Sequence, residues 1–156
     1  MKDISKAIHN LLIKKRKTLA AAESCTAGLL AHLITRNPGS SKYFLLGVSA
    51  YSNQAKEKVL KVPRCLIVDK GAVSKEVALA IAKNIRRLIN ADFAIGITGI
   101  AGPGGATHNK PLGTVFIAVA SEKENLCRKF IFRGSREQVK KRAALKSLEL
   151  LKRIVQ

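Results

Sequence analysis

Apolar residues recur along the chain with two different periods, and the two periods alternate. Over residues 3–17 and again over residues 74–90 they stand three to four positions apart, the spacing that places side chains on one face of a helix. Short runs of small or branched apolar residues lie between the helical stretches and are typical of buried strands. The pattern predicts helices over residues 3–17, 27–35, 54–60, 74–90 and 135–155, and strands over residues 18–23, 43–51, 93–98, 113–120 and 126–132.

Strands and helices alternate along the chain until the last two strands, which are adjacent. Residues 121–125 between them are polar and favour a hairpin. This order predicts an α/β fold, a three-layer α/β/α sandwich around a mixed, mostly parallel sheet. The length of 156 residues fits one domain over residues 1–156.

The charge of the chain is strongly positive. Lys and Arg total 29 against 10 Asp and Glu, which gives a formal net charge of +19. Such a field attracts anions, and its sign alone does not distinguish nucleic acid, acidic lipid and a small phosphorylated substrate. RNA-binding surfaces stack bases on exposed aromatic side chains, whereas only 4% of this chain is aromatic, mostly in predicted strands. Nucleic acid is therefore the less favoured partner.

The apolar runs and the N-terminal residues bear on the location of the protein, and the cysteines bear on metal binding. No apolar run approaches the ~20 residues of a membrane span, and Asp3 and Lys6 interrupt any secretory signal, so we expect a cytoplasmic protein that does not contact a membrane. Cys25, Cys65 and Cys127 stand far apart without a C-x-x-C pair. Reduced thiols and no metal site are predicted.

Hydroxyl residues follow the first predicted strand. In open α/β sheets, ligands bind beyond the carboxyl ends of the strands. Residues 23–28 read Glu-Ser-Cys-Thr-Ala-Gly, and the backbone N–H groups where this segment enters a helix could receive an anion. Ser24 and Thr26 could equally serve only as helix caps. A second segment, Pro-Gly-Ser-Ser at 38–41, precedes the next strand, and Tyr-Ser-Asn at 51–53 with Lys56 follows it.

A glycine-rich run over residues 98–105 follows the strand at 93–98. It is too irregular for a Walker loop or a dinucleotide-binding fingerprint, and alone it is as compatible with a tight turn as with a phosphate site. Together the three segments supply hydroxyl nucleophiles, a lysine that could act as a base, and clustered backbone donors. No histidine is placed to activate a serine, which argues against a Ser-His-Asp triad.

These segments resemble the CinA C-terminal domain family, the nicotinamide-nucleotide amidohydrolases. The resemblance rests on Glu-Ser-Cys-Thr-Ala-Gly at 23–28, Gly-Ser-Ser at 39–41, Tyr-Ser-Asn at 51–53 with Lys56, Gly-Ala-Val-Ser at 71–74, Thr-Gly-Ile-Ala-Gly-Pro-Gly-Gly at 98–105 and Lys-Pro-Leu-Gly-Thr at 110–114. Ala27 departs from it, because the family more often has glycine there, a change that we expect a helix start to tolerate.

The resemblance implies an anticodon-binding-domain-like α/β/α fold in a stand-alone, homo-oligomeric form. It implies hydrolysis of the carboxamide of nicotinamide mononucleotide to nicotinate mononucleotide and ammonia, without metal or cofactor. Carried over, the nucleophile falls on Ser41, with Ser24 as its nearest competitor and Ser40 as an alternative, assisted by Tyr51 and Lys56. The implied substrate-binding residues are Ser24, Thr26, Thr98, Gly99, Gly102, Gly104, Gly105 and an arginine, Arg136 or Arg142.

The implied chemistry requires a neutral lysine. An ammonium group has no lone pair, so Lys56 can activate a serine only if burial or neighbouring cations lower its pKa. Two alternatives remain: a catalytically inactive relative with a binding role, and a basic nucleic-acid-binding protein.

Overall fold

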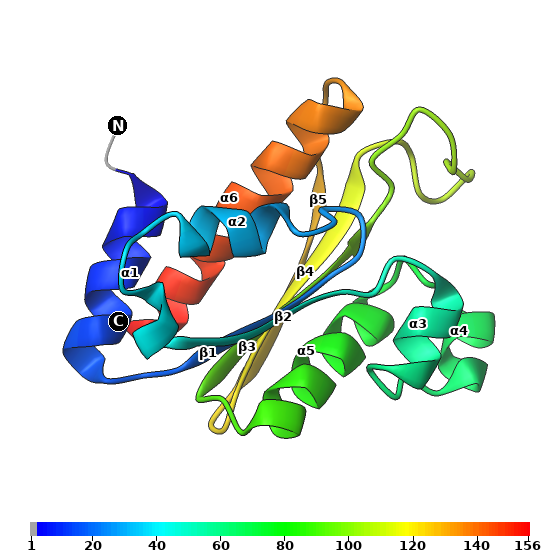
Figure 1. Cartoon of the computed structure of the whole chain (residues 1–156). Helices are drawn as coiled ribbons and strands as arrows, with labels where there is room; N and C mark the ends of the chain where they lie inside the picture. The colour runs from blue at the N-terminus through cyan, green and yellow to red at the C-terminus, as the bar shows by residue number, and fades with distance from the viewer. Residues whose placement is uncertain (1–2) are drawn as a thin grey trace.

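The computed structural model describes residues 3–156 and places a five-stranded sheet between two layers of helices (Figure 1). The strand order is β2-β1-β3-β4-β5. β1 pairs in parallel with β2 and with β3, whereas β4 runs antiparallel to both β3 and β5. The strands are β1 Leu19–Glu23, β2 Phe44–Ser49, β3 Phe93–Gly99, β4 Thr114–Ser121 and β5 Asn125–Ile131. The predicted mixed sheet is confirmed.

Helices cover both faces of the sheet, which confirms the predicted three layers. One layer holds α1, α2 and α6, and the other holds α5 with the short helices α3 and α4 (Figure 1). Their bounds are α1 Ile4–Lys15, α2 Leu29–Thr35, α3 Asn53–Lys58, α4 Arg64–Lys70, α5 Lys75–Ile89 and α6 Arg136–Val155. No helix within residues 3–156 combines the length and the apolar character that a membrane crossing needs.

The central strands are buried on both sides, and their residues are small or branched. All five residues of β1 are buried, and its alternate alanines face opposite layers, as expected of a strand covered on both faces. α5 packs very close to β3, because a Cβ at Gly96 would lie 2.6 Å from the carbonyl oxygen of Ala78. The interior strands therefore form a rigid base for the loops at their ends.

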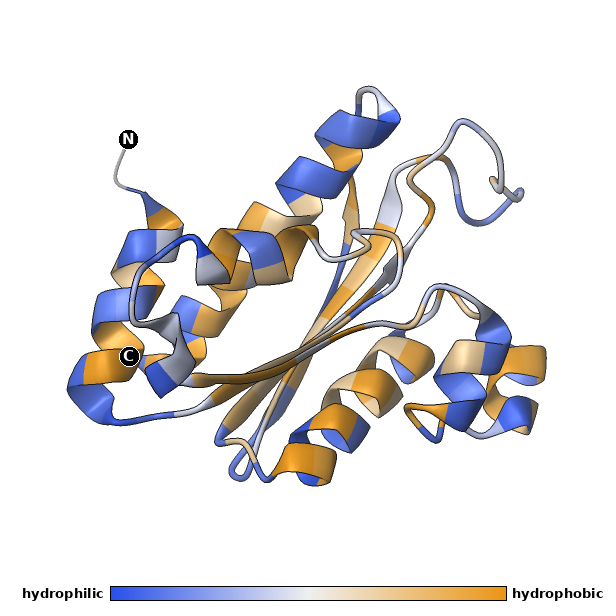
Figure 2. Cartoon of the chain, viewed as in Figure 1, coloured by the Kyte–Doolittle hydropathy of each residue, from blue (hydrophilic) through white to orange (hydrophobic). Residues whose placement is uncertain are grey.

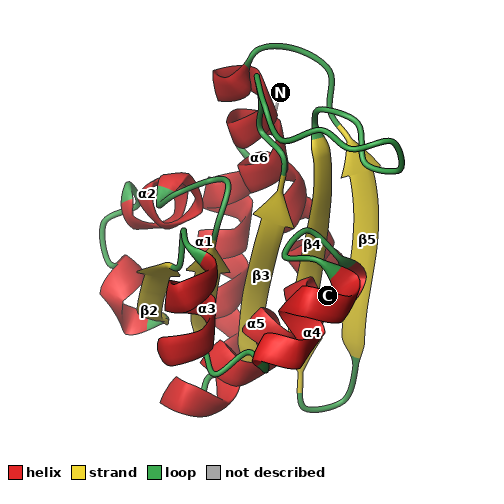
Figure 3. Cartoon of the chain, turned by 90° about the vertical axis from the view of Figure 1, so that its right-hand side faces the viewer, coloured by secondary structure: helices red, strands yellow, loops and turns green. Residues whose placement is uncertain are grey.

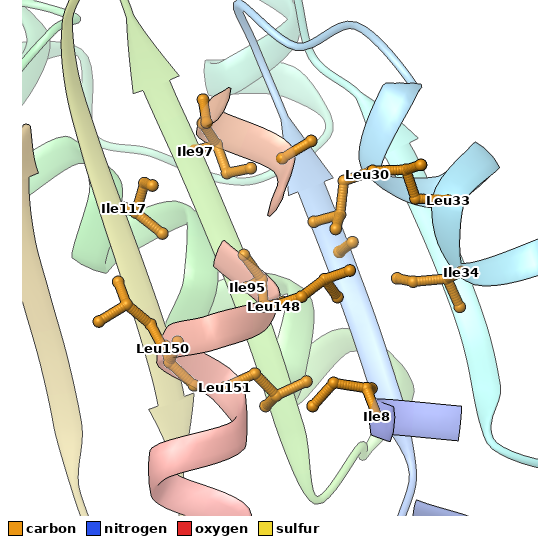
Figure 4. Packing of buried hydrophobic residues seen from close by; sticks show 14 of the residues in the cluster. Ile8, Leu30, Leu33, Ile34, Ile95, Ile97, Ile117, Leu148, Leu150 and Leu151 are labelled. Carbon is orange, nitrogen blue, oxygen red and sulfur yellow. The ribbon is translucent and has the colours of Figure 1, made fainter. Parts of the chain in front are cut away.

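The larger of the two main apolar clusters lies between the sheet and the layer of α1, α2 and α6. Figure 4 shows isoleucines of β3 and β4 meeting leucines of α6 and residues of α1 and α2. The helices turn their apolar sides toward the sheet and their hydrophilic sides outward, as Figure 2 shows. This pattern agrees with the periodicity that predicted α1, α5 and α6.

The sheet topology gathers three chain segments at one edge. Glu23 at the end of β1 pairs in register with Ser49 of β2 and with Ile97 of β3, so the three strands finish at nearly the same level. The loops that follow them lie together beyond the arrowheads (Figure 3). Because β4 returns antiparallel beside β3, the loop between these strands begins and ends at that same edge.

Three local features differ from the expectation. Helix α2 begins at Leu29 rather than at residue 27, because Ala27 and Gly28 both adopt positive φ values, 47° and 92°. Residues 40–42 form a 3-10 turn, η1, before β2. Helix α4 was not predicted, because it has only seven residues and begins directly after Pro63.

Candidate functional site

A cavity of about 300 Å³ opens at the carboxyl ends of β1, β2 and β3. Its lining comes from segments distant in sequence: residues 24–25 after β1, residues 51–56 after β2, residues 72–73 before α5, residues 98–105 after β3, and the first residue of α6. Most of the sequence-predicted site residues meet here, namely Ser24, Tyr51, Lys56, Thr98, Gly99, Gly102, Gly104, Gly105 and Arg136.

Lys56 is a buried lysine without an acidic partner in the described part of the chain. It lies on α3, whose first turn is capped by Ser52, and only 2% of its surface is exposed. Its Nζ donates a hydrogen bond to the carbonyl oxygen of Tyr51 at 3.3 Å and forms no ion pair with any of residues 3–156. Burial lowers the pKa of Lys56, since the charged form loses hydration. The amine is therefore neutral at lower pH than an ordinary lysine.

Ser24 is the serine that shares the cavity with Lys56. Its backbone N–H donates to the carbonyl oxygen of Ile97 at 3.0 Å, which extends the β1–β3 pairing by one residue and fixes the position of the side chain. The residue is 8% exposed, and it lines the cavity. A buried hydroxyl and a lysine of lowered pKa thus face the same space.

Cys25 also lines the cavity, but it is a poor nucleophile. It is 5% exposed, and burial raises the pKa of its thiol to about 12. The thiol is therefore protonated at neutral pH, whereas attack requires a thiolate.

Thr98 connects the end of β3 to the segment before α5. Its Oγ1 donates a hydrogen bond to the carbonyl oxygen of Ala72 at 2.8 Å, and the residue is almost fully buried. This bond holds residues 72–73 against the cavity. Thr98 therefore positions the wall of the site as well as lining it.

The glycine-rich run surrounds one side of the cavity, as predicted. Gly102 and Gly105 have φ values of 88° and 91°, in the left-handed region that favours glycine. Two hydrogen bonds close the base of the loop, from Ile100 N to the oxygen of Thr114 and from Gly113 N to the oxygen of Ile100, both 2.8 Å long. The loop is thus attached to the sheet at both of its ends.

Arg136 joins three parts of the site. It is the first residue of α6, and its guanidinium donates to the carbonyl oxygen of Gly102 at 2.7 Å and to the hydroxyl of Tyr51 at 2.5 Å. Of the two predicted arginines, it is the one at the cavity. Arg142 lies outside the lining and donates instead to the carbonyl oxygen of Arg133.

The expected anion site at the start of α2 is wrong, because a carboxylate already occupies it. The side chain of Glu23 accepts hydrogen bonds from the backbone N–H groups of Gly28, Leu30 and Ala31 at 3.1, 3.0 and 2.9 Å. Sequence reasoning missed this role. The available signal was a glutamate ending an apolar strand, because a buried carboxylate needs donors.

Thr26 does not line the cavity, so its expected contact with substrate is corrected. The residue is fully buried, and its Oγ1 has no hydrogen-bond partner among residues 3–156. Neither Ser24 nor Thr26 caps α2, whose N-cap is Gly28 without a side-chain bond. Asn53, in contrast, lines the cavity although it was not among the expected site residues.

Ser41 lies at the opposite end of β2 from the cavity. It is an exposed residue of η1, which precedes the strand, whereas Tyr51 follows it. The six residues of β2 span roughly 17 Å at about 3.3 Å per residue. Within one copy of the chain, Ser41 cannot reach a substrate held beside Lys56, and the grouping of Ser41 with Tyr51 and Lys56 is corrected. Its neighbour Ser40 lies at the same distant end.

The electrostatics of the cavity favour an anionic ligand. Lys56 and Arg136 contribute the ionisable cationic groups, and no aspartate or glutamate of residues 3–156 lines the cavity. No three side chains of His, Cys, Asp or Glu cluster as a metal-ligand set within residues 3–156. Backbone N–H groups of the glycine-rich loop add neutral donors of the kind that bind phosphate or an oxyanion.

Together, the fold and the cavity define a three-layer α/β domain with a serine and a buried lysine at the carboxyl ends of its parallel strands. The chain belongs to the CinA C-terminal domain family, whose model matches residues 1–155. The family expected from the sequence motifs is thereby confirmed.

Relatives in two bacteria carry the name CinA-like protein. The chain is 48% identical over 150 residues to the one from Desulfotalea psychrophila and 43% identical over 150 residues to the one from Geobacter sulfurreducens. Each match covers 96% of this chain but 36% of the relative. The chain therefore spans about a third of the length of these relatives.

Solved structures of similar proteins share the whole fold. The competence damage-inducible protein A of Klebsiella pneumoniae is 30% identical with a TM-score of 0.94, covering 97% of this chain and 94% of that one. The competence/damage inducible protein of Agrobacterium tumefaciens is 31% identical with a TM-score of 0.94, covering 100% and 98%. The arrangement of helices and strands is thus common to these proteins.

Proposed function

We propose that the cavity hydrolyses the carboxamide of nicotinamide mononucleotide, which yields nicotinate mononucleotide and ammonia. The observation that supports this most is the buried Lys56, which has no acidic partner among residues 3–156 and a lowered pKa in the same cavity as Ser24. A buried lysine without a counter-ion costs stability, so a catalytic use gives a reason for its presence. The family membership points to the same reaction.

Ser24 acts as the nucleophile and neutral Lys56 as the base. As the Ser24 Oγ attacks the carboxamide carbon, its proton passes to Lys56 Nζ, and the carbonyl becomes a tetrahedral oxyanion. The resulting ammonium then gives that proton to the departing nitrogen, so ammonia leaves and an ester to Ser24 remains. Water hydrolyses the ester with Lys56 again accepting a proton, which restores the serine and releases the carboxylate.

The cationic and backbone donors hold the substrate. N–H groups of the glycine-rich loop stabilise the oxyanion or receive the phosphate. Arg136 already donates to two oxygens at the cavity, and a phosphate is a stronger acceptor than the Tyr51 hydroxyl that it contacts at 2.5 Å. We expect the phosphate to take over part of this hydrogen bonding.

The test is ammonia release from nicotinamide mononucleotide by the full chain in metal-free buffer with chelator. The variants Ser24→Ala and Ser41→Ala form a matched pair, because each removes one hydroxyl, inside and outside the cavity respectively. We expect Ser24→Ala to lower kcat by at least about 10³-fold and Ser41→Ala to leave it nearly unchanged.

Other outcomes discriminate between the alternatives. Loss of release in Ser41→Ala alone would overturn the assignment of Ser24 and would require a second copy of the chain to complete the site. The absence of release from the unmodified protein at any substrate concentration would instead favour a binding relative without catalysis.

A further inference from the structure

A second cationic feature lies between α6 and the edge strand β5, away from the candidate site. Arg128 and Phe130 of β5 and Lys146, Glu149, Leu150 and Arg153 of α6 line a recess of about 140 Å³, here called the α6–β5 groove. Residues 128 and 130 share one face of their strand, while residues 146, 150 and 153 share one face of their helix. None of these side chains lines the candidate catalytic cavity.

The groove keeps a positive charge even though one of its cations forms an ion pair within it. Lys146 pairs with Glu149 at 2.5 Å, which neutralises both groups. Arg128 and Arg153 are exposed and form no ion pair with any of residues 3–156. The surrounding segment strengthens the field, because residues 123–156 contain eleven basic and three acidic residues. Two exposed guanidinium groups can therefore bind anions, and further cations lie in the surrounding segment.

Aromatic rings lie beside these cations. Phe130 and Phe132 stack with ring centroids 5.5 Å apart and an interplanar angle of 14°, and both are only half-buried. The ammonium of Lys146 lies 5.9 Å from the centre of the Phe130 ring. Both rings also pack against the main apolar cluster, and Phe130 alone lines the recess. A partly exposed ring beside cations is a combination with which proteins bind single strands, since a base stacks on the ring while the cations neutralise the backbone.

We propose that the α6–β5 groove binds single-stranded nucleic acid. Guanidinium groups bind phosphodiester oxygens well, and Arg128 and Arg153 bring two of them to the recess from different elements. Phe130 lines the recess, so a base reaches it only when unpaired, which favours a single strand over a duplex. A lipid surface fits less well, because membrane-binding faces present protruding apolar side chains. This inference does not depend on the proposed amidase activity.

The test uses fluorescence anisotropy of a labelled thymidine oligonucleotide titrated with the full chain at several salt concentrations. We expect affinity to fall with salt with a log–log slope of roughly −0.7 per phosphate contacted. The variant Arg128→Gln/Lys146→Gln/Arg153→Gln should weaken binding by at least about tenfold and reduce the slope by about 1.4, the share of the two guanidinium groups. Unchanged thermal unfolding would show that the fold is intact, and the pair Arg128→Gln/Arg153→Gln serves if the triple variant unfolds.

A matched control separates the groove from net charge. Arg64, Arg87 and Lys58 are exposed on α4, α5 and α3, on the opposite layer, so their change to glutamine removes the same three charges elsewhere. We expect this control to retain most of the binding. Equal weakening by both variants, absence of binding, equal affinity for a duplex of the same length, or preference for vesicles of acidic phospholipid would each overturn the proposal.

Discussion

The hydroxyl of Tyr51 accepts a hydrogen bond of 2.5 Å from the guanidinium of Arg136, although 85 positions separate the two residues in sequence. Tyr51 follows the edge strand β2 and is 56% exposed, whereas Arg136 begins the last helix. The bond therefore links the two sides of the cavity entrance, and we expect substrate to compete for it.

Arg136→Gln is expected to raise KM for nicotinamide mononucleotide by about tenfold or more, because a charge-assisted hydrogen bond to phosphate contributes roughly 1.5 to 3 kcal/mol. Tyr51→Phe should have a smaller effect on KM, since only the competing acceptor is lost. Steady-state kinetics measure both. Arg142→Gln is the matched control, because Arg142 lies outside the cavity; an equal rise in KM there would contradict the role of Arg136.

The pH dependence of hydrolysis should report on Lys56. Burial lowers the pKa of its amine, and only the neutral amine accepts the serine proton. We therefore expect kcat/KM to rise with pH and to level off below the ordinary lysine pKa of about 10.4. Lys56→Met should abolish hydrolysis at every pH. A kcat/KM that does not change with pH up to the ordinary lysine pKa would exclude Lys56 as the base.

The burial of Lys56 also affects how stability depends on pH. A lysine whose pKa is lowered by folding binds more protons when unfolded, so its contribution to the free energy of unfolding increases as pH rises toward the unfolded pKa. Lys56→Met removes this cost and should stabilise the chain below that pH, by about 1 kcal/mol or more. Urea unfolding at two pH values measures it. Lys58→Met, on the exposed side of the same helix, should have little effect.

Glu23→Gln is expected to destabilise the fold by roughly 1.5 to 3 kcal/mol, because hydrogen bonds to a charged group are replaced and an amide N–H₂ faces backbone donors. Glu23 accepts three such bonds from Gly28, Leu30 and Ala31. Chemical denaturation gives the difference. Glu57→Gln removes a carboxylate that is not fully buried on α3 and should change stability little; equal effects would argue against the capping role.

Ala27→Gly should stabilise the chain. Ala27 has a φ of 47°, a conformation that costs a residue with a Cβ about 1 to 2 kcal/mol, while glycine loses somewhat more backbone entropy on folding. We expect a net gain of roughly 0.5 to 1 kcal/mol, measured by thermal unfolding. Ala91→Gly, at a buried position that is not among the residues of positive φ, should destabilise instead.

The fold could be predicted from the sequence because its signals are local. The periodicity of α5 and the capping box of Ser135 and Gln138 lie within single segments, and both are present as expected. The glycine-rich loop and Lys56 were also found, since residues after parallel strands meet at one edge whatever the details of packing.

Apart from Ser41, the errors concern contacts between residues that no local pattern specifies. The assignment of Ser41 came from the family resemblance. The order of the segments already places residues 38–41 before the strand and Tyr51 after it, hence at opposite ends, and the structure agrees. The hydrogen bonds from the α2 N–H groups to the Glu23 carboxylate depend on a loop in which Ala27 and Gly28 adopt positive φ values. The bond between Tyr51 and Arg136 requires the whole fold to be assembled.

The connection between β3 and β4 contains the glycine-rich run. Two hydrogen bonds hold its two ends together, from Ile100 N to the oxygen of Thr114 and from Gly113 N to the oxygen of Ile100. Pro111 also belongs to the anchor, because its carbonyl oxygen accepts hydrogen bonds from Thr114 N and Oγ1. Residues 103–110 can therefore change in length or composition without shifting the register of β3 and β4. Such a separation lets ligand preference diversify while the scaffold is inherited unchanged. For protein engineers, this loop is the natural segment to randomise or to exchange between relatives when a new specificity is sought.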